Sequence, residues 1–553
     1  MKRYAIGCDF GTLSMRAVLV DTVDGRVLAE DVYEYQNGVI TDRLPESKVL
    51  LEGADWALQD PRDYLRALEQ CVPGVLRSSG VSAEEIAGIG VDFTICTVVP
   101  VDEKGNPLSF NPAFRERPHA WVKLWKNHTA QKEADDITDY VMKNNLDLLD
   151  YCGYRVSSEA FFPKVWEIYR KDREAYEAAY TFLDGGDFIV SKLVGKFVRS
   201  GVQAASRAFH DNETMQFPDA SFFGGLDPGL ANIVADKHLD NVLRVGSAAG
   251  TLSPEMAKVL GLSTDTVVCV AHADAAVALP GCGIVGPNVM AFIMGTSACY
   301  VAMSESKIKI PGISSSYYEG VLPGYYCYEA GQSAVGDIFQ WFCTHYLPAA
   351  YTEEAKARGM SPMALMDEKA AGLAIGQSGL VALDWMNGNR CVLEDSELSG
   401  LIVGLTLSTR PEEVYRALLE AVTFGAKVIM DRFVEYGVEV TEARACGGLA
   451  HKSSVLMQMY ADVLGISIQV SAYKHTSALA SAVFAAVAAG VYENHKQAVE
   501  KMVPPPSKTY TPDSANTAKY QVLFEKYKAL HDYFGGEGKA LMKGLRHLHE
   551  VVC

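Results

Sequence analysis

The sequence lacks the features that would place the protein on a nucleic acid, in a membrane or outside the cell. Its 553 residues include 50 lysines and arginines against 68 aspartates and glutamates, a formal charge of −18, so nucleic acids and anionic membranes would repel it. The longest small apolar run, residues 478–492, is mostly alanine and is interrupted by Ser481, which favours a buried helix over a membrane span. The twelve cysteines form no CxxC pair, which indicates reduced thiols and argues against structural zinc. The chain enters an apparent strand at once, so we expect no signal peptide and a cytoplasmic protein.

The order of predicted elements indicates mixed α/β domains with a weak internal duplication. The chain is too long for one core and fits two or three domains. In the first half, strands are predicted at residues 4–9, 15–21, 26–35 and 86–91, with a helix from about residue 61. In the second half, strands are predicted at residues 289–294, 298–303 and 443–446, with a helix at 411–436 capped by Thr409 and Glu412 and another from about residue 452. We place the domain boundary after residue 262, which divides the chain into domains 1–262 and 263–553.

A glycine-containing turn ends a strand in each half. Asp9-Phe10-Gly11-Thr12 ends the first strand of the chain, and Gly295-Thr296-Ser297 ends the matching strand of the second half. Glycine at a tight turn lets backbone N–H groups approach an anion, and a following Thr or Ser adds a hydroxyl donor. Two such turns from two domains could hold a polyphosphate. Taken singly, each is more simply an ordinary β-turn, because short motifs often match by chance.

Two aspartates stand where a carboxylate could take part in chemistry. Asp9, beside the first turn, would repel phosphate unless a cation such as Mg²⁺ stood between them, and the alternative is a turn-capping aspartate. Asp274 is the single carboxylate of an apolar stretch, residues 271–278. It could be a general base for an acceptor hydroxyl or a helix N-terminal acid favoured by the dipole, and local features weigh the two interpretations equally.

Three further segments are candidates for lining a binding site. Gly447-Gly448 follows a strand and permits close approach to a flat ligand such as adenine, although a plain tight turn explains it as well. Residues 384–390 form a polar loop that contains Asn389 and is suitable for lining a cleft. Glu329 and Gln332 are expected to open an aromatic-rich helix, where they could bind sugar hydroxyls or cap that helix.

Together these motifs resemble the FGGY carbohydrate kinases, a branch of the actin-like, ribonuclease-H-like ATPase superfamily. The resemblance covers nearly the whole chain, in order. The two glycine turns are similar to the family's phosphate motifs, Cys446-Gly447-Gly448-Leu449 is similar to its adenosine motif, and Asp274 falls at its catalytic aspartate. Within the family, the resemblance is strongest to the kinases of L-ribulose in arabinose breakdown, and residues 328–339 carry it most specifically.

The resemblance implies an α/β fold of two ribonuclease-H-like (actin/sugar-kinase-like) domains with a deep interdomain cleft, and ATP and Mg²⁺ as cofactors. The residues that it implies for the nucleotide are Asp9, Gly11, Thr12, Gly295, Thr296, Ser297, Asn389, Gly447 and Gly448. The residues that it implies for the sugar are Asp92, Thr94, Cys96, Arg207, Asp274 and Glu329. Asp9 and Asp274 would hold Mg²⁺, in part through water. Asp274 would receive the proton of the acceptor, the 5-hydroxyl of L-ribulose or of a close 2-ketopentose.

The sequence departs from the family pattern mainly on the sugar side. Ala160 stands where tryptophan is usual, Arg207 stands where a lysine is expected, and Ser481 follows alanine where Leu-Gly is common. One rival hypothesis is a kinase of xylulose, ribitol or glycerol from the same family. Another is an actin- or chaperone-type nucleotide-dependent binding protein. The expected partner is a small-molecule sugar, and a homodimer is left open.

Overall fold

The segments near the start of the chain in which apolar and polar residues alternate form strands, and these strands belong to a seven-stranded sheet. In the computed structural model, which describes residues 2–151 and 155–552, the strand order is β11-β12-β5-β1-β2-β3, with β13 paired to β5. The strands are β1 (Tyr4–Phe10), β2 (Ser14–Asp21), β3 (Val27–Glu34), β5 (Ile86–Phe93), β11 (Ala248–Thr251), β12 (Val267–Cys269) and β13 (His272–Ala273). Strand β1 is antiparallel to β2 and parallel to β5. Helix α1 (Pro61–Ser79) packs on this sheet, with Asp60 as its N-cap.

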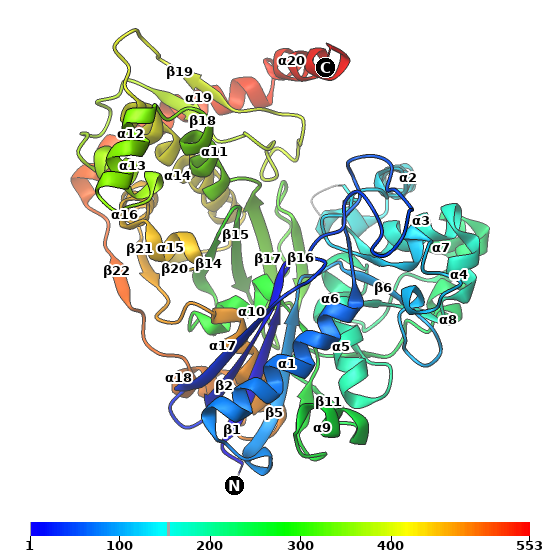
Figure 1. Ribbon diagram of the computed structural model, residues 1–553. Coiled ribbons are helices and arrows are strands. Elements are labelled where there is room, and N and C mark those ends of the chain that lie inside the picture. The colour runs from blue at the N-terminus through cyan, green and yellow to red at the C-terminus, as the bar shows by residue number, and fades with distance from the viewer. Residues whose placement is uncertain (1, 152–154, 553) are drawn as a thin grey trace.

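A second seven-stranded sheet repeats this arrangement in the other half of the chain, with the order β16-β17-β15-β14-β20-β21-β22. The strands are β14 (Asn288–Met294), β15 (Ala298–Ser304), β16 (Ser315–Tyr318), β17 (Tyr326–Gln332), β20 (Val440–Cys446), β21 (Ser467–Val470) and β22 (Lys508–Tyr510). Strand β14 is antiparallel to β15 and parallel to β20, as β1 is to β2 and β5. The predicted duplication is therefore confirmed, and Figure 1 shows the two sheets with their own helices.

Residues 94–247 form most of a lobe beside the first sheet, on the right in Figure 1. Its sheet has the order β4-β7-β6-β8. The strands of the lobe are β4 (Leu58–Gln59), β6 (Val98–Val101), β7 (Val122–Lys123) and β8 (Thr181–Asp184), with the small pair β9 (Arg199–Ser200) and β10 (Val242–Leu243). Its helices are α2 (Gln131–Lys143), α3 (Phe161–Lys171), α4 (Arg173–Ala178), α5 (Gly185–Val194), α6 (Gly201–Arg207), α7 (Ala220–Leu226) and α8 (Ile233–Asp236).

One helix cap in the second half differs from the sequence prediction, and one short helix was not predicted. The remaining elements are α9 (Pro254–Leu260), α10 (Asp274–Gly281), α11 (Gly336–His345), α12 (Ala349–Ala357), α13 (Pro362–Ala371), β18 (Val381–Leu383), β19 (Leu401–Val403), α14 (Pro411–Glu435), α15 (Gly448–Lys452), α16 (Ser454–Leu464), α17 (Thr476–Ala488), α18 (His495–Met502), α19 (Ser514–Gly535) and α20 (Lys539–Val552). Helix α14 begins at Pro411, as predicted, but its capping pair is Arg410 with Glu413 rather than Thr409 with Glu412, because the residue before Pro411 is the N-cap. The helix predicted from about residue 452 is α16, which begins at Ser454, and the short helix α15 precedes it from Gly448.

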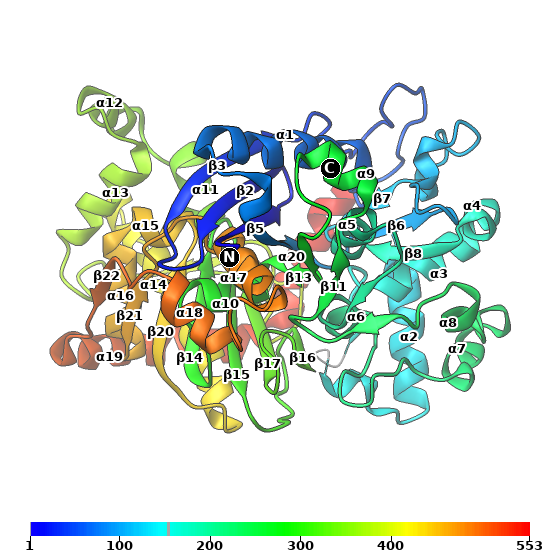
Figure 2. The same ribbon diagram turned by 90° about the horizontal axis from the view of Figure 1, so that it is seen from below.

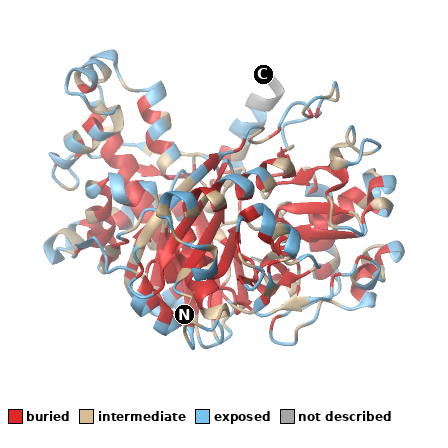
Figure 3. Ribbon diagram, turned by 60° about the horizontal axis from the view of Figure 1, so that its bottom comes forward, coloured by how far each residue is buried: buried red, intermediate tan, exposed pale blue. Residues whose placement is uncertain are grey.

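Helix α17, the predicted buried helix, packs on the first sheet although it follows the second sheet in sequence. A Cβ on Gly7 would lie 1.8 Å from the carbonyl oxygen of Ala478, and one on Gly90 would lie 2.0 Å from that of Ser481. These glycines therefore let the helix backbone rest directly on strands β1 and β5. Figure 2 shows α17 and α10 in the middle of the molecule, and Figure 3 shows the central strands as largely buried.

The helix contact links the C-terminal part of the chain to the N-terminal sheet. Strands β12 and β13 also lie beyond residue 262 and belong to the first sheet, and the division of the chain after residue 262 stays a prediction. Among residues 2–151 and 155–552, no helix combines the length and the apolar character that crossing a membrane requires.

Candidate active site

Three carboxylates meet at the carboxyl ends of neighbouring strands. Asp9 on β1 lies opposite Asp92 on β5, and Asp92 lies opposite His272 on β13, so Asp274 follows two residues later at the same edge. Burial and the negative charge of Asp9 raise the pKa of Asp92 well above its usual range. The same two causes raise the pKa of Asp274 to about 7. Asp9 accepts a hydrogen bond from Arg16 Nη1 at 3.1 Å.

Asp274 is the first residue of α10, and its surroundings suit a proton acceptor. Its Oδ1 accepts from the Ala275 N–H at 2.8 Å, and its carbonyl oxygen accepts from Ser477 Oγ at 3.0 Å. The predicted position as a helix N-terminal acid is therefore confirmed, and the carboxylate also lies among the other site residues. A carboxylate with a pKa near neutrality is well matched to general-base work at the pH of most cells.

Each glycine turn adjoins a residue that lies close to Asp274, namely Asp9 at the first turn and Cys299 after the second. The first is closed by the Gly11 N–H, which donates to Ser14 O at 3.0 Å, and the second by the Gly295 N–H, which donates to Ser297 O at 2.8 Å. Thr296, at the tip of the second turn, is exposed. Burial, followed by the Glu329 and Asp274 carboxylates, raises the pKa of Cys299 to about 12, so Asp274 also lies close to the strand that leaves the second turn.

The Gly447-Gly448 turn lies directly beside the second glycine turn. Gly447 has φ +91°, and a Cβ there would be 2.3 Å from the carbonyl oxygen of Met294, the last residue of β14. Only glycine fits this position without moving the backbone. Gly448 differs, because no atom lies within 4 Å of where its Cβ would be. The fold therefore requires Gly447, whereas Gly448 leaves open space next to the turn.

Charged side chains from both halves of the chain form a cluster near Asp274. Glu159 accepts hydrogen bonds from Arg207 Nη1 and, at 3.3 Å, from Arg390 Nη2. Burial would raise the pKa of Glu159, but the two guanidinium groups outweigh it and hold the pKa at about 2. The Glu329 carboxylate helps to raise the pKa of both Asp274 and Arg207, so it lies close to both.

The other predicted sugar residues lie deeper. Thr94 and Cys96 are buried, with exposed fractions of 5% and 2%, and Asp92 has no exposed surface. The Asp92 carboxylate accepts from Ser481 Oγ at 2.6 Å. This bond gives the serine at position 481 a structural role, since it supplies a donor to a buried carboxylate.

The sequence did not single out Arg390, because its neighbour Asn389 in the same polar loop is an equally suitable residue for lining a cleft. Asn389 is buried, and its Oδ1 accepts a hydrogen bond from the Leu393 N–H at 3.0 Å, so this side chain stabilises its own loop. Arg390, the next residue of the same polar loop, instead reaches Glu159 in the lobe. A charged residue at the end of the loop was the available signal.

The expected helix at Glu329 and Gln332 is wrong. These residues lie on strand β17, and the helix begins only at Gly336. Gln332 is buried and donates to Asp384 Oδ2 at 2.7 Å. Strand alternation sends Gln332 into the core, whereas Glu329 lies toward Asp274.

The acidic residues fit a metal that arrives with a nucleotide. Among the described side chains, no group of three or more His, Cys, Asp or Glu residues is arranged to hold a metal ion by itself. Mg²⁺, however, is usually bound by one or two carboxylates together with phosphate oxygens and water. Burial first, and the charge of Asp9 second, raises the pKa of Asp92 and Asp274, and a divalent cation beside these carboxyl groups would favour their ionised forms.

The comparisons with known proteins identify the family. The N-terminal domain model of the FGGY family of carbohydrate kinases matches residues 4–281, and the C-terminal domain model matches residues 290–489. The chain belongs to the FGGY family of carbohydrate kinases. A ribulokinase of Shouchella clausii is 46% identical to this kinase, covering 99% of this chain and 98% of the relative. A ribulokinase of Halalkalibacterium halodurans is 44% identical, with the same coverage of 99% and 98%.

Solved structures confirm the predicted fold of two ribonuclease-H-like domains. A xylulose kinase of Rhodospirillum rubrum superposes with a TM-score of 0.80 at 24% identity, covering 96% of this chain and 99% of that one. A gluconate kinase of Lactobacillus acidophilus superposes with a TM-score of 0.80 at 19% identity, covering 96% and 98%. This kinase is thus an ATP-dependent sugar kinase by family and by fold, and the actin- or chaperone-type alternative is set aside.

Proposed function

We propose that this kinase transfers the γ-phosphoryl group of ATP to the 5-hydroxyl of L-ribulose or of a close 2-ketopentose. The observation that carries the proposal is the 46% and 44% identity, over almost the entire chain, to two relatives named ribulokinase. The cluster of Arg207, Glu159 and Glu329 supports it, because a polyhydroxylated sugar needs charged and polar side chains to hold its hydroxyls.

In this proposal the nucleotide lies along the two glycine turns. Gly11, Thr12, Gly295, Thr296 and Ser297 face the phosphates, and adenine lies near Gly447 and Gly448. The residue Asn389 also stays on the predicted nucleotide side, although its oxygen is used within its own loop. Mg²⁺ held by the phosphates, Asp9 and Asp274 would neutralise negative charge that develops during transfer.

The acceptor sugar lies near Thr94, Cys96, Arg207 and Glu329, with Asp92 beneath them. Asp274 takes the proton of the attacking hydroxyl as that oxygen approaches the γ-phosphorus. Exclusion of water by the surrounding domains prevents the transfer of phosphate to water. The location in the cytoplasm and the homodimer stay predictions.

The proposal is tested by assaying ATP-dependent phosphorylation of L-ribulose, D-ribulose, D- and L-xylulose, ribitol and glycerol. The highest kcat/KM is expected for L-ribulose. A clear preference for xylulose, ribitol or glycerol would reject L-ribulose and favour another FGGY kinase activity. ATP consumption that no member of the panel stimulates would contradict the proposal as a whole.

A further inference from the structure

Cys96, in the loop that the proposal assigns to the acceptor, has an unusual backbone held from both sides by buried charged groups. Its φ is +64°, a region that residues other than glycine rarely adopt. Its N–H donates to Asp184 Oδ2 at 3.1 Å, and its carbonyl oxygen accepts from Lys164 Nζ at 2.7 Å. The conformation of this loop therefore depends on side chains that lie outside it.

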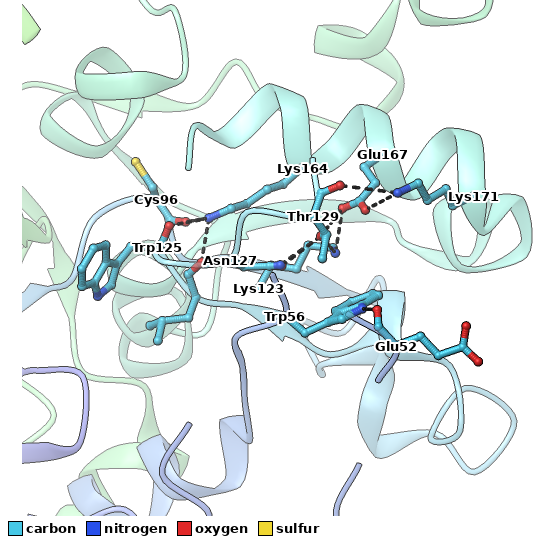
Figure 4. Close-up of polar contacts among 11 residues, drawn as sticks. Glu52, Trp56, Cys96, Lys123, Trp125, Asn127, Thr129, Lys164, Glu167 and Lys171 are labelled. Carbon is cyan, nitrogen blue, oxygen red and sulfur yellow. Dashed lines mark hydrogen bonds and ion pairs between the residues drawn. The ribbon is translucent and has the colours of Figure 1, made fainter. Parts of the chain in front are cut away.

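Lys164 on α3 binds a second loop at the same time. Its Nζ also donates to Leu124 O at 2.8 Å and Trp125 O at 3.4 Å. The side chain has no exposed surface, and its three donors all go to backbone carbonyls of two loops far apart in sequence (Figure 4). An ammonium group in the interior is costly unless its donors are satisfied. Here all of them hold the main chain.

The second loop continues to the first glycine turn. The Trp125 indole Nε1–H donates to Thr12 Oγ1 at 3.1 Å. Gln59 Nε2 fixes the same residue by donating to Thr12 O at 2.7 Å. Hydrogen bonds thus run from Cys96 through Lys164 and Trp125 to Thr12, that is, from the acceptor side to the phosphate side.

We propose that Lys164 is a positioning residue that sets the acceptor loop, residues 94–97, in place against the first glycine turn, residues 10–13. The proposal rests on the proposed function, which places the acceptor at the first of these segments and phosphate at the second. Phosphoryl transfer depends on the separation and alignment of the two reactants, and a displacement of about 1 Å can cost about 10²-fold in rate. Lys164 touches neither reactant in this arrangement and acts through the backbone of both segments.

The chain offers a matched control for a purely structural role. Lys237 is also buried, also lies in the lobe, and donates only to the backbone oxygens of Tyr176 and Ala179, at 2.8 and 2.7 Å. Neither of these residues belongs to the acceptor loop or to a glycine turn. Lys237→Met therefore removes the same kind of contact with no route to the site.

The test compares Lys164→Met with Lys237→Met in the full-length protein. First, hydrogen exchange is measured without any sugar. Lys164→Met is expected to speed amide exchange in residues 94–97, 124–126 and 11–14, and Lys237→Met is expected to leave those segments unchanged. In steady-state assays, Lys164→Met is expected to lower kcat/KM for the acceptor by about 10- to 100-fold and to leave KM for ATP close to that of the wild type.

Several outcomes would overturn the proposal. Unchanged exchange at residues 94–97 would do so, as would the same kinetic pattern in both variants. If Lys164→Met does not fold, Trp125→Phe keeps a smaller aromatic ring and removes the N–H donor to Thr12. This variant is expected to speed exchange in residues 11–14, and no change there would reject the connection. Hydrogen exchange is measured without sugar and does not depend on the substrate. A wild-type protein that phosphorylates no ketopentose would therefore contradict the proposed function without changing the exchange result for Lys164→Met.

Discussion

The two sides of the candidate active site are built from different chemical groups, backbone on one side and charged side chains on the other. On the proposed nucleotide side, the turns at Gly295 and Gly447 contain no charged residue, and Gly447 packs against the backbone of Met294. On the proposed acceptor side, the buried charged groups Glu159 and Arg207 form an ion pair. A triphosphate can be held by backbone amides, which every residue except proline supplies, whereas a neutral sugar needs particular side chains at particular places. We therefore expect a methyl group added at a glycine turn to raise KM for ATP, and a charge removed on the acceptor side to raise KM for the sugar.

The largest effect is expected at Asp274, which lies close to residues of both sides. Asp274→Asn removes the proton acceptor and should lower kcat by roughly 10²- to 10⁴-fold. ATP binding, measured by calorimetry, should persist because the glycine turns are unchanged. A variant that turns over at the wild-type rate would eliminate Asp274 as the base.

The pH dependence of the wild-type kinase should report the same residue. Because the pKa of Asp274 is raised from 3.8 to about 7, kcat/KM for the sugar should fall about tenfold per pH unit below that value, where the base is protonated. The folded protein holds this proton more tightly than the unfolded chain, so this group's contribution to stability is lost as the pH rises from about 4 through about 7.

Asp274→Asn supplies the control for that profile. The asparagine cannot ionise, so the variant should gain stability relative to the wild type as the pH rises through this window, as measured by urea unfolding at pH 5 and pH 8. A stability difference that does not change with pH would contradict the raised pKa.

A pair of glycine variants tests the nucleotide side. Gly447→Ala places a Cβ 2.3 Å from Met294 O at a φ of +91° and should destabilise the fold by roughly 1–3 kcal/mol. Gly448→Ala adds its methyl group to open space, so the fold should be unaffected while KM for ATP rises by roughly tenfold. If Gly448→Ala left KM for ATP unchanged, adenine would not lie at this turn.

The acceptor side is tested by Arg207→Ala. Loss of a charged donor is worth roughly 1.5–3 kcal/mol, so KM for the sugar should rise by about tenfold or more, with KM for ATP nearly constant. Glu159→Gln should give a smaller change in the same direction, since Arg207 remains but loses its charged partner. Arg117→Ala, which breaks the ion pair to Asp172 elsewhere in the lobe, is the control. Equal rises in KM for the sugar and KM for ATP would show that Arg207 does not act on the sugar alone, and would contradict the separation of the two sides.

The smallest effect on the kinetic constants is expected for Ser481→Ala, which removes a hydrogen bond beneath the site. The variant leaves a buried Asp92 oxygen without its donor at 2.6 Å and should cost about 1–3 kcal/mol of unfolding free energy. The KM values should stay close to those of the wild type, because Ser481 faces neither reactant. A sugar-specific rise in KM would instead show that Asp92 must be held in place for acceptor binding.

Most strands at the centre of the two large sheets could be predicted from the local sequence pattern, and the wrong prediction at Glu329 has a physical cause. The strands β1, β2, β14 and β15 were predicted within a residue or two of their ends, because alternation and glycine turns are local signals. The segment at Glu329 was predicted as a helix because its apolar and aromatic residues suit either structure. Its strand form is decided by pairing with β15 and β16, which lie elsewhere in the sequence.

The sequence by itself determined the family, the two duplicated sheets and the order of the glycine turns, because these depend on short motifs and on the period of apolar residues. Only the tertiary structure decided that Glu159 joins Arg207 to Arg390, that Lys164 holds two loops, and that α17 rests on Gly7 and Gly90. Each of these contacts joins segments distant along the chain. Nothing in the local sequence of one segment specifies its partner, because that choice depends on how the sheets and the lobe pack together.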